Sequence, residues 1–293
     1  MSLTREITPN AASNTPEQSG VSQGGTSKAG RHLGPRSFGR VNWIGWQSLY
    51  MKEVRRFLNV ATQTIAAPVV TTLLFLAIFS LALGHAVEMV RGVLFPVFLA
   101  PGLIVMAMVQ NSFANTSSSL VISKVQGNIV DVLMPPINSI EMVSAYALAG
   151  VSRGLLVGMT TGLFMWIFVP FHVANWGLVA YHAVSASLML SLIGIIGGIW
   201  ADKFDHMAAI TNFVITPFAF LSGTFYSIER LPEPFHTIAY FNPFFYMIDG
   251  FRSGMIGVAD APTWLGMLVM FSINLVLALI AWRMVATGYK LKN

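Results

Sequence analysis

Residues 216–257 read TPFAFLSGTFYSIERLPEPFHTIAYFNPFFYMIDGFRSGMIG, and they give the clearest indication of the fold class. It is too apolar for a solvated loop, and Pro217, Pro232, Pro234 and Pro243 interrupt it too often for one membrane helix. Non-helical backbone is tolerated at membrane depth only where protein buries it or where it lines a cavity. The stretch therefore predicts a hydrophobic span followed by a short re-entrant excursion on one membrane face, an arrangement typical of proteins that move molecules.

The composition of the whole chain agrees with a membrane protein. Of the 293 residues, 55% are hydrophobic and 10% are charged, and the mean hydropathy is +0.66. These values indicate an all-α polytopic membrane protein. The chain has no cysteine, which excludes disulfides and thiolate chemistry. The net charge of +5 comes from basic residues that flank apolar segments, which favours a role in membrane orientation over nucleic-acid binding.

Six segments are long and apolar enough to cross a membrane, which takes about 20 residues. They lie at about 62–84, 93–115, 142–170, 177–200, 207–227 and 263–287. An N-terminus in the cytoplasm leaves only Arg91, Arg230 and Arg252, of the 17 lysines and arginines, on the outside. Because basic residues gather on the cytoplasmic side, both termini are predicted to be cytoplasmic and residues 228–262 external.

The first forty residues differ from the rest. They are rich in Ser, Gly, Pro and Thr and contain no apolar run. Such a segment buries too little surface to fold and lacks the apolar core of a signal peptide. Glu6 and Glu17 disfavour a mitochondrial transit peptide. We expect a disordered cytoplasmic tail at 1–40 and a transmembrane domain at 41–293.

Two cytoplasmic segments have the pattern of amphipathic helices. In residues 43–59, Trp43, Trp46, Leu49, Tyr50 and Leu58 can share an apolar face, with Lys52, Arg55 and Arg56 near the other. This helix is either a membrane anchor or a surface for a partner, and the sequence leaves both open. Residues 123–141 mix polar and apolar side chains before Pro135 and Pro136, which predicts a short docking helix that ends near Met134.

Glycines recur at four-residue intervals in the third span. Gly150, Gly154, Gly158 and Gly162 place a flat groove on one helix face, and Gly194 and Gly198 repeat the pattern in the fourth span. Small residues at this spacing allow close helix packing in membranes, which is the expected use here.

Catalytic and metal sites are not indicated. Residues 150–154 match G-x-S-x-G, but the motif lies in an apolar helix rather than in the strand–turn–helix that a nucleophile elbow needs. The histidines lack metal-ligand spacing. Carboxylates avoid the spans, which argues against a carrier driven by an ion gradient. The chain has no phosphate loop, so any ATPase must be a separate subunit that carries ATP and Mg²⁺.

One polar stripe interrupts the second span. It consists of Gln110, Asn111, Asn115, Thr116, Ser117, Ser118 and Ser119. These side chains either line a pathway or satisfy one another at the cytoplasmic interface, and we favour the interface.

Residues 43–290 resemble the permeases of ABC-2 type exporters, most closely the bacterial branch that exports drugs, nodulation factors and polysaccharides. The motifs that carry the resemblance, in chain order, are Lys52-Glu53, Arg55-Arg56, Ala100-Pro101-Gly102-Leu103, Val125-Gln126-Gly127-Asn128-Ile129, Met134-Pro135-Pro136, Phe204-Asp205, Thr216-Pro217, Leu221-Ser222-Gly223-Thr224-Phe225-Tyr226, Leu231-Pro232, Asn242-Pro243, Tyr246 and Gly250-Phe251-Arg252.

The resemblance implies two sets of site residues. Contacts with a separate ATPase subunit would come from Lys52, Glu53, Arg55, Arg56, Lys124, Gln126, Asn128, Asp131 and Met134. The pathway or its external gate would involve Leu221, Gly223, Phe225, Tyr226, Asn242, Pro243, Tyr246 and Arg252.

The resemblance also implies an assembly and a cargo. Two identical permease copies would work with two ATPases in the bacterial inner membrane and move an amphiphile outward. The cargo would be a lipid, a lipid-linked glycan or a hydrophobic drug. From the residues alone, an ATP-independent channel or lipid scramblase is the alternative, and a membrane-embedded enzyme comes third.

Overall fold

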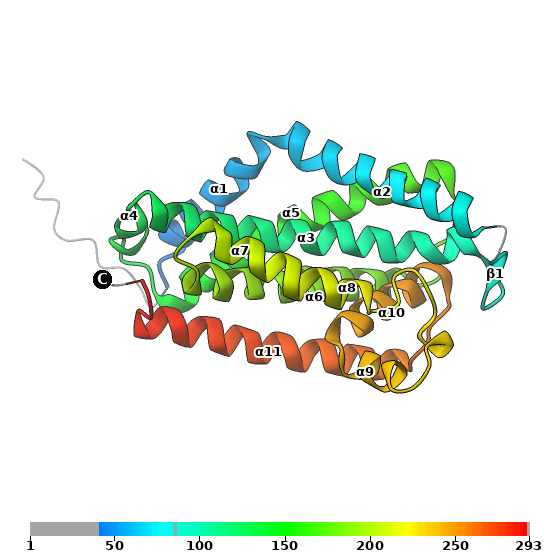
Figure 1. Cartoon of the computed structure of the whole chain (residues 1–293). Coiled ribbons are helices and arrows are strands. Elements are labelled where there is room, and N and C mark those ends of the chain that lie inside the picture. Colours follow the sequence, from blue (N-terminus) through cyan, green and yellow to red (C-terminus); the bar gives the residue numbers. More distant parts are fainter. Residues whose placement is uncertain (1–40, 85–86, 292–293) are drawn as a thin grey trace, which may run out of the picture. The chain divides into compact units, whose positions relative to one another are not determined.

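The computed structural model describes residues 41–84 and 87–291, so the predicted disordered tail at 1–40 lies outside the described residues. The elements are α1 (Trp43–Leu58), α2 (Ala61–Leu83), β1 (Met89–Val90), β2 (Val93–Leu94), α3 (Phe95–Val125), α4 (Ile129–Leu133), α5 (Ser139–Phe168), α6 (Trp176–Trp200), α7 (Phe204–Ile210), the π-helical turn η1 (Thr211–Ile215), α8 (Thr216–Phe220), the 3₁₀ turn η2 (Ile228–Arg230), α9 (Phe235–Phe241), α10 (Pro243–Ile256) and α11 (Thr263–Thr287). The predicted all-α membrane fold is confirmed (Figure 1).

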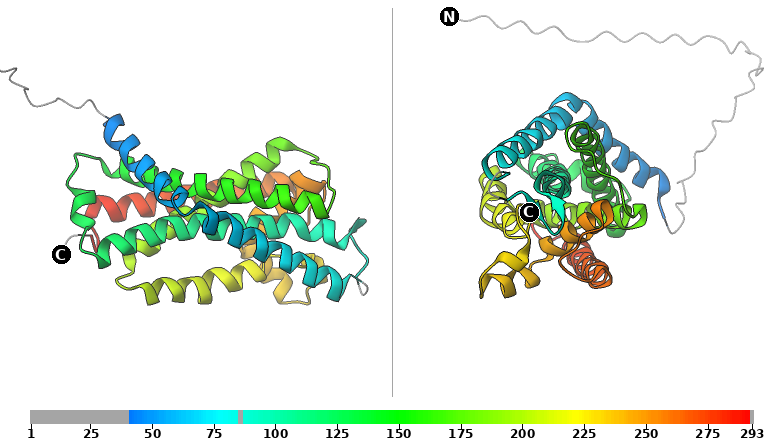
Figure 2. Two further views of the ribbon diagram at one scale, coloured as in Figure 1. Left: turned by 90° about the horizontal axis from the view of Figure 1, so that it is seen from above. Right: turned by 90° about the vertical axis from the view of Figure 1, so that its right-hand side faces the viewer.

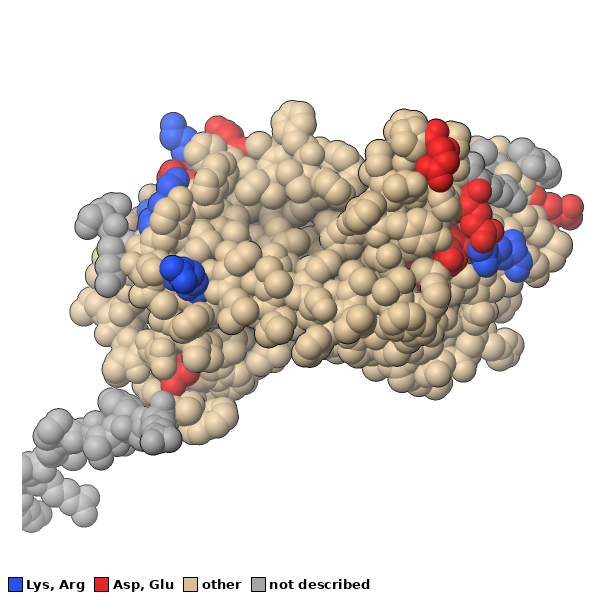
Figure 3. Space-filling view, turned by 90° about the horizontal axis from the view of Figure 1, so that it is seen from below, with Lys and Arg blue, Asp and Glu red and all other residues tan. Residues whose placement is uncertain are grey.

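Among the described residues, five helices are long and apolar enough to cross a membrane: α2, α3, α5, α6 and α11. They run side by side, with α4 at one end and the β1–β2 hairpin, α9 and α10 at the other (Figure 1). We call these the α4 end and the hairpin end. Charged side chains gather toward both ends of the face in Figure 3 and leave a broad uncharged region between them, as a lipid-facing surface requires.

The predicted span at 207–227 is not one α-helix. The chain runs through α7, η1 and α8, and Pro217 lies at the start of α8, where its missing N–H is tolerated. Phe204 lines the same hollow as Val121 of α3, and a Cβ on Gly102 of α3 would lie 2.9 Å from the Thr224 carbonyl oxygen. The segment thus follows α3 for about 28 Å at the usual helical rise. The count of six spans stays a prediction.

Helix α3 lies at the centre of the other helices (Figure 2). It is buried over most of its length and packs mainly against α6 and α5. Glycines permit the closest contacts: a Cβ on Gly194 of α6 would lie 2.8 Å from the Phe113 carbonyl oxygen of α3. On α5, a Cβ on Gly154 would meet the Ser112 hydroxyl, whereas one on Gly162 would have its nearest neighbour at 3.7 Å.

At the hairpin end, α10 turns back among α6, α3 and α11. Asn242 begins this helix: its Oδ1 accepts a hydrogen bond from the Phe244 N–H at 3.0 Å. Gly257 ends it in the left-handed region, at φ 72°. Most of α10 is buried, whereas Phe235, Ile238 and Phe241 of α9 are exposed. The side of the membrane on which residues 228–262 lie stays a prediction.

Candidate functional site

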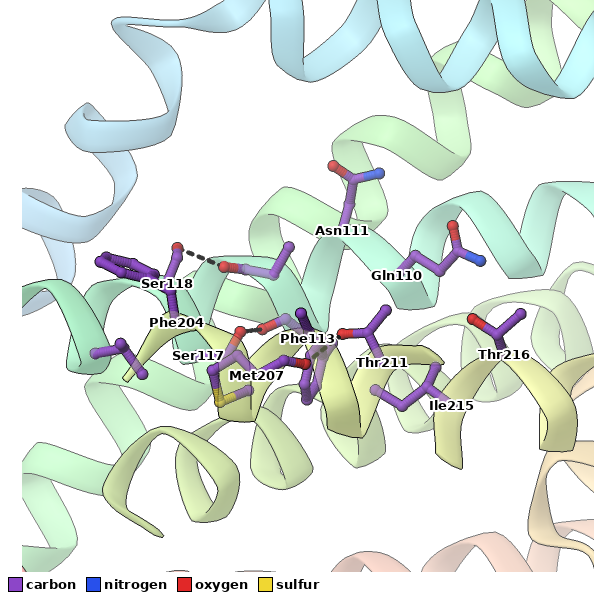
Figure 4. Close-up of a pocket in the computed structure, with 13 residues that line it drawn as sticks. Gln110, Asn111, Phe113, Ser117, Ser118, Phe204, Met207, Thr211, Ile215 and Thr216 are labelled. Atoms are coloured by element: carbon purple, nitrogen blue, oxygen red, sulfur yellow. Dashed lines mark hydrogen bonds between the residues drawn. The ribbon is translucent and has the colours of Figure 1, made fainter. Parts of the chain in front are cut away.

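A groove follows the open side of α3 in the half of the protein nearer the α4 end. It is a hollow of about 470 Å³ between α3 and the α7–η1–α8 segment. Its walls combine apolar side chains with amide and hydroxyl groups (Figure 4). The lining residues are Gln110, Asn111, Phe113, Ala114, Ser117, Ser118, Val121, Phe204, Met207, Ala208, Thr211, Ile215 and Thr216.

The structure divides the polar stripe of the second predicted span. Thr116 is buried and donates to the Ser191 carbonyl of α6 at 2.9 Å, and Ser117 donates to the Phe113 carbonyl at 2.7 Å. Gln110 and Asn111, in contrast, rise from α3 on the side of α2 (Figure 4) and are at least partly exposed. Thr116 and Ser117 thus donate hydrogen bonds to backbone carbonyls of the bundle, whereas Gln110 and Asn111 line the hollow.

A second hollow, of about 240 Å³, lies on the other side of the same residues, between α2 and α3. Gln110 and Asn111 line it together with Pro68, Phe75 and Met106. The two amides therefore stand between two hollows whose remaining walls are largely apolar. Neutral hydrogen-bonding groups beside apolar walls suit the binding of an amphiphile.

Helix α1 contains an ion pair whose two members form hydrogen bonds with α3. The Glu53 side chain is fully buried; its Oε2 lies 3.0 Å from Arg56 Nε, and its Oε1 accepts a hydrogen bond from Ser119 at 2.8 Å. Arg56 Nη2 donates to Asn115 Oδ1 at 3.1 Å. Glu53 and Arg56, which the family resemblance assigns to the ATPase contact, are thus turned toward α3.

The other two residues of that set on α1 lie at the surface. Lys52 and Arg55 are exposed and line a shallow hollow of about 730 Å³ together with Ile44 and Met51. The aromatic residues of the predicted apolar face lie next to one another, with ring centres 6.0 Å apart for Trp43 and Trp46 and 5.6 Å apart for Trp46 and Tyr50. Trp43 is 68% exposed, and Trp46 Nε1 donates to Ser144 of α5 at 3.0 Å.

The predicted docking helix is shorter than the sequence suggested. Helix α3 continues to Val125, Gly127 turns the chain at φ 74°, and α4 covers Ile129–Leu133. Gln126, Asn128, Asp131 and Met134 are exposed and together form a surface at the α4 end.

Lys124, the remaining member of the set, has partners within the chain. Its Nζ donates to the carbonyls of Ile199 at 2.9 Å and Ala201 at 2.7 Å, and lies 3.1 Å from Asp202 Oδ1. Hydrogen bonds from Lys290 and Lys124 lower the pKa of Asp202 to about 2. Lys124 thus stabilises the C-terminal end of α6, because a cation is favoured near the free carbonyl groups there.

The residues that the resemblance assigns to the pathway or its external gate lie at the hairpin end, and we call them the external set. Several of them are buried. Arg252 is fully buried; its Nη2 donates to the Gly223 carbonyl at 2.6 Å, and its guanidinium lies 3.9 Å from the Phe98 ring centre. Gly223 adopts φ 75°, which favours glycine. Phe225 stacks near Phe79, with ring centres 4.5 Å apart.

The other members of the external set have packing roles. Asn242 and Pro243 begin α10, and Tyr246 is buried within it. Leu221 ends α8, and Tyr226 donates to the Phe220 carbonyl at 3.3 Å.

Two polar features went unrecognised in the sequence. Arg91, in the β1–β2 turn, lies 2.8 Å from Asp260 and also pairs with Glu229, which joins the hairpin to the segments before α9 and before α11. Arg153 of α5 donates to Asn111 Oδ1 at 3.1 Å. The sequence offers no local signal for the first, since the partners lie far apart in the chain; the second is visible as a charge inside an apolar span.

Known proteins resemble this chain over nearly all of the described bundle. The ABC-2 type transporter family matches residues 45–256. The inner membrane transport permease YadH of Escherichia coli (strain K12) is 36% identical over 253 residues, which are 86% of this chain and 98% of the relative. Nodulation protein J of Rhizobium leguminosarum bv. viciae is 25% identical over 240 residues, 80% of this chain and 90% of the relative. The chain therefore belongs to the ABC-2 type transporter family, as a transmembrane permease.

Proposed function

We propose that this permease exports an amphiphile across the bacterial inner membrane, driven by a separate ATPase subunit. The groove along α3 carries the proposal, because it offers polar side chains at the centre of otherwise apolar walls. A lipid, a lipid-linked glycan or a hydrophobic drug has both kinds of surface. Inner-membrane location and transport are supported by the relative YadH, whose name states both.

A second permease copy would complete the pathway. The α7–η1–α8 segment beside the groove exposes Phe213 at 81% and Phe218 at 43%, and α2 on the other side exposes Val70 at 64% and Leu74 at 58%. A homodimer through this face would enclose the groove between two copies of α3. We place the α4 end and both termini on the cytoplasmic side of the membrane, because the basic residues of α1 are favoured there.

The surface around α4 would receive the ATPase. It contains exposed Gln126, Asn128, Asp131 and Met134 on a segment that joins α3, the central helix, to α5. A movement of α4 caused by the ATPase would therefore be transmitted to α3, the helix that lines the groove.

Purification of the tagged full-length chain from its native membrane tests the proposal. We expect a stoichiometric ATPase with a phosphate loop to co-purify with the wild type and to be lost from Asp131→Lys, while membrane insertion is unchanged. Glu88→Lys, an exposed position at the hairpin end, is the matched control and should retain the ATPase. A homo-oligomer without ATPase, even after crosslinking, would contradict the proposal and favour an ATP-independent channel or lipid scramblase.

A further inference from the structure

Arg153 is a charged residue near the middle of the membrane helix α5 with few partners. Within the part of the chain that the structure describes, its guanidinium makes one hydrogen bond, from Nη2 to Asn111 Oδ1 at 3.1 Å. Its Nε is buried and has no partner there. A charge in a membrane span is costly unless it is paired, and such residues mark functional sites. The open donors of Arg153 therefore indicate a ligand.

A second guanidinium lies one helical turn away along α3. Arg56 Nη2 donates to the Asn115 carbonyl at 2.6 Å and to Asn115 Oδ1 at 3.1 Å, and residues four apart on a helix are neighbours. Among the described residues that make these contacts, Glu53 supplies the one carboxylate, and it pairs with Arg56. The cluster thus keeps one uncompensated positive charge, on Arg153.

The cluster reaches an apolar cleft through Asn111. Asn111, which accepts from Arg153, lines the hollow between α2 and α3, whose walls continue with Phe75, Leu103 and Met106. Pro68, in the second turn of α2, lines the same hollow. Because α2 is about as long as a membrane is thick, the cluster lies roughly 10 Å inside the boundary at the α4 end, by helical rise. A polar head placed here would have its chain directed toward the middle of the membrane.

We infer that Arg153, with Arg56, binds the phosphate head of an anionic lipid from the leaflet at the α4 end, and that the lipid's acyl chain occupies the cleft between α2 and α3. Guanidinium groups form paired, charge-assisted hydrogen bonds to phosphate, and the exposed Gln110 adds a neutral donor beside them. The inference deepens the proposed function by giving the amphiphile a negative charge, and it rests on that function for the export of the bound lipid.

Lipid titration of the purified full-length chain, followed by native mass spectrometry, tests the site. The probes are dioleoylphosphatidylglycerol and dioleoylglycerol, which share their acyl chains and differ in the phosphate head. We expect the wild type to bind the phosphate lipid at least about tenfold more tightly. Arg153→Gln should abolish this preference. Arg283→Gln, an exposed arginine of α11, is the matched control and should retain it.

A second variant and a competition experiment test the site independently of Arg153→Gln. Thr71→Trp fills the cleft from α2 and leaves both arginines in place, so it should weaken the lipid even where Arg153→Gln folds poorly. Competition by inorganic phosphate at the same concentration would assign the site to the free anion and overturn the lipid assignment. Equal affinity of the wild type for the two lipids, or an unchanged preference in Arg153→Gln, would also overturn it. None of these titrations needs an ATPase, so a failure here is distinct from a failure to co-purify one.

Discussion

The carboxylate of Glu53 has no exposed surface, yet its two oxygens keep Arg56 and Ser119 as partners. Taking a charge out of water is unfavourable, and only close, well-formed contacts offset that cost. Glu53 therefore acts as an anchor that fixes α1 against α3. Its neighbour Lys52 is exposed, so two adjacent residues of the same predicted docking set have different physical roles.

Replacement of Glu53 should separate these roles. Glu53→Ala removes the carboxylate partner of Arg56 and the acceptor of Ser119, and should lower the free energy of unfolding by about 2–3 kcal/mol. The expected loss is below that of a wholly buried pair, because 30% of the Arg56 side chain is exposed. Thermal unfolding in detergent measures it. Lys52→Ala, the matched control, should change stability by less than about 0.5 kcal/mol; equal shifts for the two variants would contradict the anchor role.

At the scale of elements, the contact between α3 and α6 depends on glycine. Gly194 faces backbone atoms of α3, and a Cβ there would lie 2.8 Å from the Phe113 carbonyl oxygen. Backbone cannot move aside as the end of a flexible side chain can. Gly162 of α5 belongs to an equally regular series, but its Cβ would make an ordinary contact at 3.7 Å. Regular spacing alone thus does not identify which glycines carry the packing.

Two alanine substitutions should therefore have opposite effects. Gly194→Ala should destabilise the protein by about 1–3 kcal/mol because it overpacks the contact. Gly162→Ala should be neutral or stabilise the helix by up to about 1 kcal/mol, since alanine favours helix over glycine. Unfolding midpoints of the two variants in one detergent give the comparison. A loss at Gly162 as large as that at Gly194 would show that the whole glycine series is tightly packed.

The α7–η1–α8 segment contains a π-helical turn beside the groove. This turn, at Thr211–Ile215, interrupts the regular α-helical pattern of the helical run from Phe204 to Phe220, and Gly223 then turns the chain at φ 75°. Single-turn π-helices often occur at functional sites. This segment forms one wall of the groove.

For the molecule as a whole, the arrangement of ends can be tested directly because the chain contains no cysteine. Asp131, in α4, and Glu233, just before α9, are exposed at opposite ends of the bundle. In intact spheroplasts, we expect a membrane-impermeant maleimide to label Glu233→Cys and to leave Asp131→Cys unlabelled until the membrane is permeabilised. Labelling of both variants from the same side would contradict the predicted orientation.

The membrane class, five of the six predicted spans and the ABC-2 resemblance follow from local composition and from motifs that lie in chain order. Runs of about 20 apolar residues require a membrane, and the prolines after Pro217 predict a broken segment without knowledge of its neighbours. The span at 207–227 stays a prediction, because hydropathy does not distinguish a regular α-helix from a helical run that contains a π-helical turn.

The side-chain partners, in contrast, become visible once the helices are packed together. Glu53 and Ser119, Arg153 and Asn111, and Arg91 and Asp260 meet across long stretches of sequence. Periodicity places a side chain on one face of its own helix, but the neighbouring helix decides whether that face is buried. For this reason the sequence did not reveal that Glu53 and Arg252 are buried, which follows from the contacts of Glu53 with Ser119 and of Arg252 with Phe98, both on α3.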